Sequence, residues 1–283
     1  MMVKTIVTHL VPDLDAIASV WLLKKFLPGW DKAEVKFVPA GKTLNNEIVD
    51  SDPEVLHVDT GMGILDHHQT SEDTCAAKRT LEYVLKAESR KKLKGAEKEA
   101  LERMVEVVND TDHFKEVYYS EAAADYYDFS LPGMLDGWKV TYGDDSQRIL
   151  ELGLISLDAI YRKFLDKVWA EREIKEKGVP FESKWGKAMG VETVNDETLK
   201  VAQKMGYILV VRKDPYKDYV RIKGLPNSEV DLTKVYNVLR KRDPEASWFL
   251  HISKKMLLNG STKNPETRPT KLTLREIIDV LRK

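Results

Sequence analysis

Residues 5–15 read TIVTHLVPDLD, a short β-branched run followed by the polar side chains of His9, Asp13 and Asp15. The β-branched run favours a strand over Thr5–His9, and apolar residues at helical spacing over 16–27 favour a helix after it. Further short apolar runs predict strands over 35–38, 55–58 and 64–65. Strands that alternate with helices indicate an α/β fold in which helices flank a parallel sheet.

The next part of the chain is helical in pattern and then changes in composition near Gly178 and Pro180. Helices are predicted over 76–89, 96–109 and 147–175. We expect residues 1–177 to form a first domain that ends in a linker helix. Residues 178–283 should form a smaller α/β domain.

The elements of the smaller domain are expected from Gly206 onward. Its predicted strands cover 207–211, 219–222 and 248–252, and a helix covers 232–239. A last helix should follow Thr273, because Thr273 and Glu276 have the spacing of a capping box, in which two side chains bond each other's backbone N–H groups.

Charge is balanced overall but uneven along the chain. There are 45 Lys and Arg residues against 46 Asp and Glu, which argues against bulk binding to nucleic acid or to an anionic membrane. Residues 201–283 hold 18 basic and 9 acidic side chains, a net charge of +9, so residues 1–200 carry 27 minus 37, or −10. An acidic front is therefore joined to a basic back.

Cysteine usage and hydropathy bear on the compartment. The one cysteine, Cys75, excludes an intramolecular disulfide and a cysteine-rich zinc site. No apolar run approaches the roughly 18 residues of a membrane span, and none near the N-terminus is long enough for the core of a signal peptide. We therefore expect a cytoplasmic protein with no membrane partner.

Four short segments of the acidic part carry side chains suited to metal chemistry. They are His9–Asp15, His57–Gly61, Asp66–His68 and Asn109–Phe114. In the first, Pro12 favours an extended backbone at the residue before it, and residues two apart on an extended chain share a face, so Asp13 and Asp15 can aim at one point. Two carboxylates that close repel each other unless they share a cation. Alternatively, one of them only caps the following helix.

Asp66, His67 and His68 form the strongest of these signals. Adjacent histidines behind a carboxylate do not serve to pack a core. Neutral imidazole is the commonest metal ligand, and a neighbouring carboxylate fixes its orientation. Successive side chains of an extended chain point apart, so His67 and His68 should have different roles. Asp59, at a strand end, could alternatively be a solvated residue at the edge of a loop. The fourth segment could alternatively be the polar C-terminus of a helix.

In this order the segments resemble the DHH phosphoesterase superfamily of metal-dependent phosphohydrolases, named for the triplet that stands here at 66–68. The shared features are His-x-x-x-Asp-x-Asp at 9–15, the strand-end Asp59, the triplet, and Asp110-Thr111 followed by Phe114. The superfamily includes RecJ-type and Myg-type nucleases, oligoribonucleases and family II inorganic pyrophosphatases. The resemblance covers roughly the first 130 residues. It implies a metal-binding catalytic domain over 1–177 and a small basic substrate-binding domain over 178–283.

The resemblance also implies two Mn²⁺ ions per active site, for which Mg²⁺ or Co²⁺ could substitute. One ion would be held by His9 and Asp13 and the other by Asp15, His67 and Asp110, with Asp59 bridging both. Asp112 is the alternative to Asp110. The catalytic residues would be His68, which faces the substrate, Asp66, which orients His68, and the bridging Asp59. A hydroxide shared by the two ions would attack phosphorus without a covalent intermediate.

Basic residues of the second domain would contact the remaining oxygens of a substrate phosphate. The candidates are Lys254, Lys255, Asn259, Arg268 and Lys271. Alternatively, these are ordinary solvated side chains.

We expect a phosphodiester substrate, either a short oligonucleotide or a cyclic dinucleotide, and a chain that could form a homodimer. The glycine-rich signature of RecJ-type accessory domains is missing, and Ser253–Lys255 only faintly echoes the basic signature of the pyrophosphatases. A phosphoanhydride such as pyrophosphate is the alternative substrate. A metal-binding regulatory module without catalysis is the alternative function.

Overall fold

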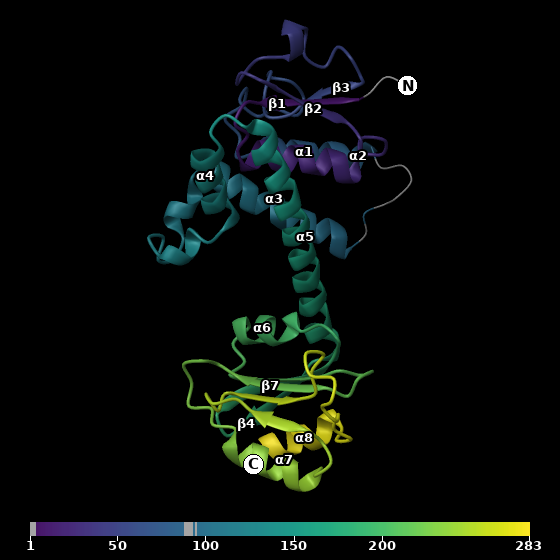
Figure 1. Cartoon of the computed structure of the whole chain (residues 1–283), viewed down its shortest axis with the longest axis vertical. Coiled ribbons are helices and arrows are strands. Elements are labelled where there is room, and N and C mark those ends of the chain that lie inside the picture. Colours follow the sequence, from purple (N-terminus) through teal and green to yellow (C-terminus); the bar gives the residue numbers. More distant parts are fainter. Residues whose placement is uncertain (1–3, 88–92, 94) are drawn as a thin grey trace. The chain divides into compact units, whose positions relative to one another are not determined.

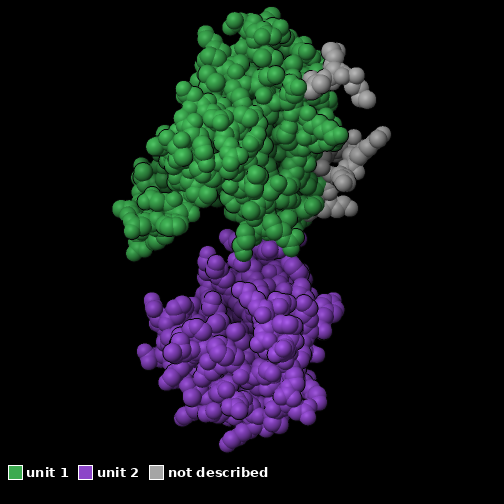
Figure 2. Space-filling model, in the orientation of Figure 1, with its two compact units in different colours: residues 1–165 green, residues 166–283 purple. Residues whose placement is uncertain are grey.

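The computed structural model describes residues 4–87, 93 and 95–283. The chain divides into two compact units, Met1–Leu165 and Asp166–Lys283, which Figure 2 shows in two colours. Each unit contains its own sheet. In the described part of the chain, no helix combines the length and the apolarity that crossing a membrane requires.

The first unit is built around three parallel strands in the order β2-β1-β3. These are β1 (Thr5–His9), β2 (Glu34–Val38) and β3 (Val55–His57). The central strand β1 is fully buried at Ile6, Val7 and Thr8. Parallel strands end at the same edge of a sheet, and in open α/β sheets ligands bind beyond that edge.

Three helices pack against one another beside this sheet: α1 (Leu14–Phe26), α2 (Ala76–Ala87) and α3 (Ala96–Asp112) (Figure 1). Every residue of α1 from Leu14 to Leu23 is buried, as expected of a helix surrounded by other elements. α5 (Ser146–Lys177) passes beside α1, where Gly153 leaves room for Ile17. A Cβ at position 153 would lie 2.6 Å from a methyl group of Ile17, so the close approach requires glycine.

Short helices fill the stretch between α3 and α5. They are the 3₁₀ helices η2 (Lys115–Tyr118) and η3 (Asp125–Tyr127) and the helix α4 (Leu131–Tyr142); a further 3₁₀ turn, η1 (Leu44–Asn46), follows β2. α4 has a proline in its first turn, where no backbone N–H is needed, and ends before Gly143. The sequence predicted no element here.

The second unit contains a six-stranded sheet in the order β4-β5-β6-β7-β9-β8, antiparallel except between β5 and β6. Its strands are β4 (Val179–Ser183), β5 (Gly186–Glu192), β6 (Leu209–Lys213), β7 (Val220–Gly224), β8 (Trp248–Leu250) and β9 (Met256–Asn259). Its helices are α6 (Glu197–Lys204), α7 (Thr233–Arg242) and α8 (Leu274–Leu281).

Alternate side chains of the central strand β6 enter two separate cores of this unit. Val211 packs in a cluster with residues of α7 and α8, including Leu239 and Ile278. Its neighbour Val210 packs in another cluster with Leu199 of α6 and Ile174 of α5. Successive residues of a strand point to opposite faces, so the helices cover both faces of the sheet.

The α/β fold class is confirmed, and so are most elements predicted for the first unit. β1, β2, β3 and α1 lie within a few residues of their predicted ranges. α2 ends at Ala87, and the predicted helical residues 88 and 89 lie outside the described residues. The predicted strand over 64–65 is wrong, because only a single bridge joins Leu65 to Val58. α3 extends past its predicted end to Asp112.

In the second unit, the strands predicted over 207–211 and 219–222 are confirmed as β6 and β7, as are the helix α7 and the capping box of Thr273 and Glu276. The expectation that elements begin at Gly206 is wrong, because β4, β5 and α6 precede it. Pro180 is tolerated because β4 is an edge strand. The units divide at Leu165, within α5 rather than at its end, and the roles expected of residues 1–177 and 178–283 stay predictions.

Candidate metal centre

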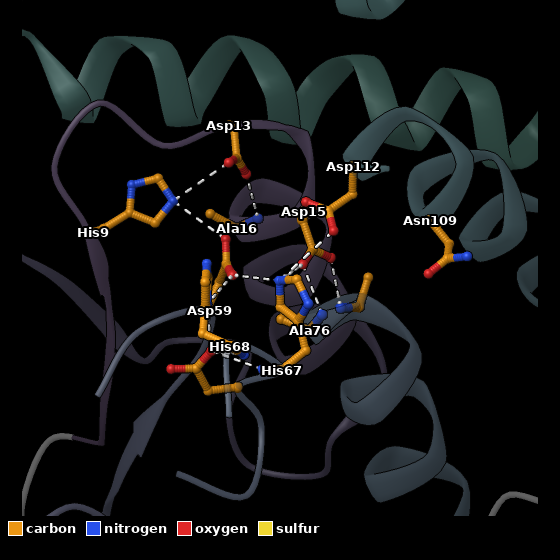
Figure 3. A network of polar contacts seen from close by, with 12 residues as sticks. His9, Asp13, Asp15, Ala16, Asp59, His67, His68, Ala76, Asn109 and Asp112 are labelled. Carbon is orange, nitrogen blue, oxygen red and sulfur yellow. Dashed lines mark hydrogen bonds and ion pairs between the residues drawn. The ribbon is translucent and has the colours of Figure 1, made fainter. Parts of the chain in front are cut away.

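A cluster of carboxylates and imidazoles lies at the carboxyl edge of the three-stranded sheet. His9 is the last residue of β1, and Asp59 follows β3 after the bridged residue Val58. Asp13 caps α1, and Asp112 is the last residue of α3. Strand ends and helix ends thus bring residues far apart in the sequence to one place (Figure 3).

The first group consists of His9, Asp13 and Asp59, whose ligand atoms lie within 4.8 Å of one another. His9 Nε2 is 3.2 Å from Asp59 Oδ2 and 3.7 Å from Asp13 Oδ2. The other oxygen of Asp13, Oδ1, accepts the N–H of Ala16 at 3.0 Å and so caps α1. Asp13 therefore does both things that the sequence left open: it caps the helix and faces the cluster.

The second group consists of Asp15, His67 and Asp112, again within 4.8 Å. His67 Nε2 lies 3.7 Å from Asp15 Oδ2 and 3.7 Å from Asp112 Oδ2. It also lies 3.5 Å from Asp59 Oδ1. Three carboxylates around one imidazole nitrogen form a group of ligand atoms that could hold a metal ion.

Asp59 belongs to the first group and also to a third, with His67 and His68, whose ligand atoms again lie within 4.8 Å of one another. Its Oδ2 faces His9 and its Oδ1 faces His67, as Figure 3 shows. The side chain is buried, and Oδ1 has no hydrogen-bond partner among the residues that the structure describes. A buried carboxylate oxygen without a partner is costly, so this atom fits a metal ligand well. The backbone of Asp59 has a φ of +54°, a conformation that is uncommon for a residue other than glycine.

Asp15 is held by the N-terminus of α2. Its Oδ2 accepts the N–H of Ala76 and its Oδ1 that of Ala77, both at 2.7 Å, and the side chain is buried. Burial raises the pKa of Asp15, and the nearby carboxylate of Asp59 raises it further. A cation beside Asp15 would stabilise its ionised carboxylate and so oppose both of these effects on its pKa.

Without a cation, the cluster favours the protonated histidines. Burial lowers the pKa of His9, but its contacts with Asp13 and Asp59 outweigh burial and raise the pKa to about 10. The contact with Asp59 likewise raises the pKa of His67 to about 9, against the effect of burial. In the metal-free protein at neutral pH, the protonated rings of His9 and His67 thus supply part of the positive charge that a metal ion would supply.

Asp66 orients the histidine pair. Its Oδ1 accepts the backbone N–H of His67 at 2.7 Å and contacts His68 Nδ1 at 2.7 Å, while Oδ2 accepts the N–H of Met62 at 2.7 Å. Burial raises the pKa of Asp66, but these bonds outweigh it and lower the pKa overall. His68 is 55% exposed, whereas His67 is 15% exposed, so the two neighbours do have different surroundings.

The fourth segment brings Asp112, and not Asp110, to the cluster. Asp110 lies 3.4 Å from the ammonium of Lys115 instead. The reason is that the segment belongs to the last turn of α3 and does not follow the helix as expected. Residues two apart on a helix differ by about 200° in direction, so only one of the pair can face His67.

Two further observations modify the sequence analysis. Val11 has a φ of +50° and is not extended, although it precedes Pro12; its N–H donates to Ser146 Oγ at 2.9 Å. The sequence predicts no role for Asn109, but the residue is buried and donates from Nδ2 to Asp73 Oδ1 at 2.7 Å. The only sequence signal for it was its place at the start of the fourth segment.

Of the residues predicted to bind substrate in the second unit, Asn259 is fully buried. Its Nδ2 donates to the carbonyls of Ser247 and Arg268, each at 3.1 Å, and its Oδ1 accepts the N–H of Thr270 at 2.7 Å. These bonds join β9 to the residue before β8 and to the loop that follows β9, so the amide is engaged within the fold.

The three lysine candidates of this unit have partners within it. The ammonium of Lys255 donates to the carbonyls of Ser228 and Val230. Lys254 lies 3.5 Å from Asp231, Lys271 lies 3.3 Å from Glu245, and Arg268 is exposed. Contact of these cations with substrate stays a prediction.

No protein-family model matches the sequence, and no curated protein matches it. Among solved structures, a member of the s1p family of ribosomal proteins described as a DHH domain aligns over 99% of this chain and 85% of its own, with 11% identity and a TM-score of 0.32. A Methanococcus jannaschii protein named as a candidate family II inorganic pyrophosphatase aligns over the whole of both chains, with 16% identity and a TM-score of 0.22.

An exopolyphosphatase-related protein from Bacteroides fragilis aligns over 98% of this chain and 89% of its own, with 12% identity and a TM-score of 0.24. At these identities and TM-scores, none of the three likenesses carries an argument about this chain.

Proposed function

We propose that this chain is a DHH-type phosphohydrolase with a dinuclear Mn²⁺ centre in its first unit, for which Mg²⁺ or Co²⁺ could substitute. The observation that carries the proposal is the position of Asp59, whose two oxygens face two separate groups of ligands. A single buried carboxylate shared by two His–Asp groups suits a pair of cations that act together.

The residues present fit such a pair. His9, Asp13 and Asp59 would hold one ion, and Asp15, His67 and Asp112 the other. Asp59 Oδ1, which lies 3.5 Å from His67 Nε2, would join the second ion as well. Carboxylates and imidazoles without thiolate suit Mn²⁺ or a neighbouring first-row ion. When bound, the two ions supply a hydroxide nucleophile at neutral pH and stabilise negative charge on the phosphoryl oxygens.

We assign the contact with the substrate phosphate to His68. Asp66 holds His68 Nδ1 at 2.7 Å, which fixes the ring and leaves Nε2 as the nitrogen that can reach a substrate oxygen. Nε2 makes no hydrogen bond to any residue that the structure describes, and the side chain is half exposed. Asp66 therefore acts as a positioning residue, and His68 as a donor to the phosphate or to the leaving oxygen.

The substrate we propose is a phosphodiester in a short oligonucleotide or a cyclic dinucleotide. The net charge of +9 over residues 201–283 supports it, because cationic side chains attract a phosphate backbone. We also propose a cytoplasmic location, which the single cysteine supports.

The test is a product-release panel with added Mn²⁺ on a dinucleotide, a cyclic dinucleotide, a short single-stranded RNA and pyrophosphate. We expect cleavage of the diesters by the wild type, and a loss of about a hundredfold or more in His68→Ala with metal still bound. His251→Ala is the matched control, because His251 lies in the second unit and contacts Ser253. Cleavage of pyrophosphate alone would show that the substrate is a phosphoanhydride and not a phosphodiester. Bound metal without turnover of any substrate would contradict the proposal that the protein is an enzyme.

A further inference from the structure

A cavity of about 260 Å³ lies in the first unit directly beside the candidate metal ligands. Asp13, Asp15 and Asp112 form the wall that it shares with the metal centre. The remaining walls come from the segment after α3 and from α4, which the proposed function does not use. Any substrate whose phosphate reaches the metal centre has room here for a neighbouring group.

The charges of the walls away from the metal centre do not suit a second phosphate. Lys139 of α4 is the cation there, and the carboxylates of Glu116 and Asp136 line the same part of the cavity. Lys139 Nζ lies 3.9 Å from Asp136 Oδ1. Two carboxylates against one ammonium leave this part of the cavity negative, which disfavours an anion and accepts a neutral group with hydrogen-bond donors.

Glu116 offers an unused acceptor to such a group. Its Oε2 is buried and has no hydrogen-bond partner among the described residues, although Glu116 lines the cavity. A buried acceptor without a partner costs free energy that a hydroxyl or amine of a ligand would recover. The hydroxyls of a sugar are donors of this kind.

Apolar side chains complete the cavity. Leu14 and Leu135 are buried, and Phe114 stands at the edge with 73% of its surface exposed. Phe114 has a φ of +56°, a conformation that costs free energy in a residue other than glycine and is typical of functional sites. An exposed aromatic ring beside a polar cavity is a surface on which a planar base can stack.

We infer that this cavity binds the nucleoside that is attached to the scissile phosphate, with its base against Phe114 and a sugar hydroxyl on Glu116. The inference rests on the proposed function, because it takes the phosphate to be at the metal centre. It names the substrate as a nucleotide ester and assigns its recognition to Phe114 and Glu116 of the first unit.

The experiment measures the affinity of the full Mn²⁺-loaded chain for adenosine 5′-monophosphate, ribose 5-phosphate and inorganic phosphate by calorimetry. We expect Phe114→Ala to weaken the binding of adenosine 5′-monophosphate by about tenfold and to leave ribose 5-phosphate within twofold, because only the former has a base to stack. Tyr118→Ala is the matched control: Tyr118 is 86% exposed and close in sequence but lies outside the cavity lining. It should change neither affinity.

Glu116→Ala should weaken both sugar phosphates and leave inorganic phosphate unchanged. The number of bound Mn²⁺ ions, measured on each variant, shows that the centre is intact. Equal effects of Phe114→Ala and Tyr118→Ala on adenosine 5′-monophosphate would overturn the inference, and so would equal weakening of all three ligands by Glu116→Ala. A wild type that binds the nucleotide through Phe114 but hydrolyses no ester would refute the proposed function and leave the subsite standing.

Discussion

Two carboxylates of the candidate metal centre each contact both a helix N-terminus and a histidine of the centre. Asp13 caps α1 with one oxygen and faces His9 with the other, and Asp15 accepts two N–H groups of α2 while it faces His67. Such bonds hold a carboxylate in one orientation before a cation arrives. The positions of Asp13 and Asp15 are therefore set by the ends of helices, which are rigid parts of the fold.

The choice between Asp110 and Asp112 gives the first prediction. Asp112→Asn should reduce the number of Mn²⁺ ions bound from two to one, because Asp112 faces His67, whereas Asp110→Asn should keep both ions. Native mass spectrometry of the two variants counts the ions. The opposite pattern would return the ligand to Asp110.

The second prediction concerns pH. The pKa of His9 is about 10 and that of His67 about 9 in the metal-free protein, so at pH 7 Mn²⁺ must displace a proton from each. Affinity for Mn²⁺ should therefore rise as the pH increases from 6 towards 9, with release of protons on binding. Calorimetry in buffers of different ionisation enthalpy measures that release. An affinity independent of pH over this range would contradict the assignment of both histidines as ligands.

At this scale the sequence predicted the metal-ligand candidates through their types and order, but it could not decide one of them. Whether Asp110 or Asp112 faces the centre depends on where α3 ends, and helix ends are uncertain by one or two residues. Val11 shows the same limit, since its positive φ arises in a tertiary setting that includes Ser146, far along the chain.

Among the elements, those with strong periodicity or clear end signals could be predicted. α8 is the clearest example, because the spacing of Thr273 and Glu276 predicts its start and the two residues do form the capping box. The missed elements contain residues that disfavour them: Pro180 lies in β4, and Gly133 and Gly137 interrupt the apolar spacing of α4. The cavity depends on α4, so the proposed nucleoside subsite could not be predicted from sequence.

The third prediction tests the capping of α8. Thr273→Ala removes the acceptor for the N–H of Glu276 and should lower the free energy of unfolding by about 1 kcal/mol. Denaturant unfolding measures the loss. Thr111→Ala is the control. It also removes a hydroxyl from a helix, but the Thr111 hydroxyl donates to the carbonyl of Val107 within α3, so the loss of unfolding free energy should be smaller. No difference between the two variants would show that the cap contributes nothing.

At the scale of the molecule, the two units have separate cores and opposite charge tendencies. The candidate metal centre and the cavity beside it belong wholly to the first unit. The basic residues 201–283 belong wholly to the second. Composition revealed this asymmetry, but the division within α5 could not be read from it, because the helix continues through the boundary.

This separation gives the fourth prediction. Mn²⁺ at a hundred times its dissociation constant should stabilise the first unit by about 2.7 kcal/mol per site and leave the second unchanged. Hydrogen exchange measured peptide by peptide distinguishes them, with β1 and α1 reporting on the first unit and β6 and β7 on the second. Equal protection of both units would mean that the metal is bound elsewhere. His67→Ala should reduce the protection of the first unit.

The central feature of the proposed centre is a pair of cations that share Asp59. Anomalous diffraction from crystals grown with Mn²⁺ tests this directly. We predict two peaks in contact with Asp59, one beside His9 and Asp13 and the other beside Asp15, His67 and Asp112. A single peak, or a peak at Asp110 in place of Asp112, would contradict the account.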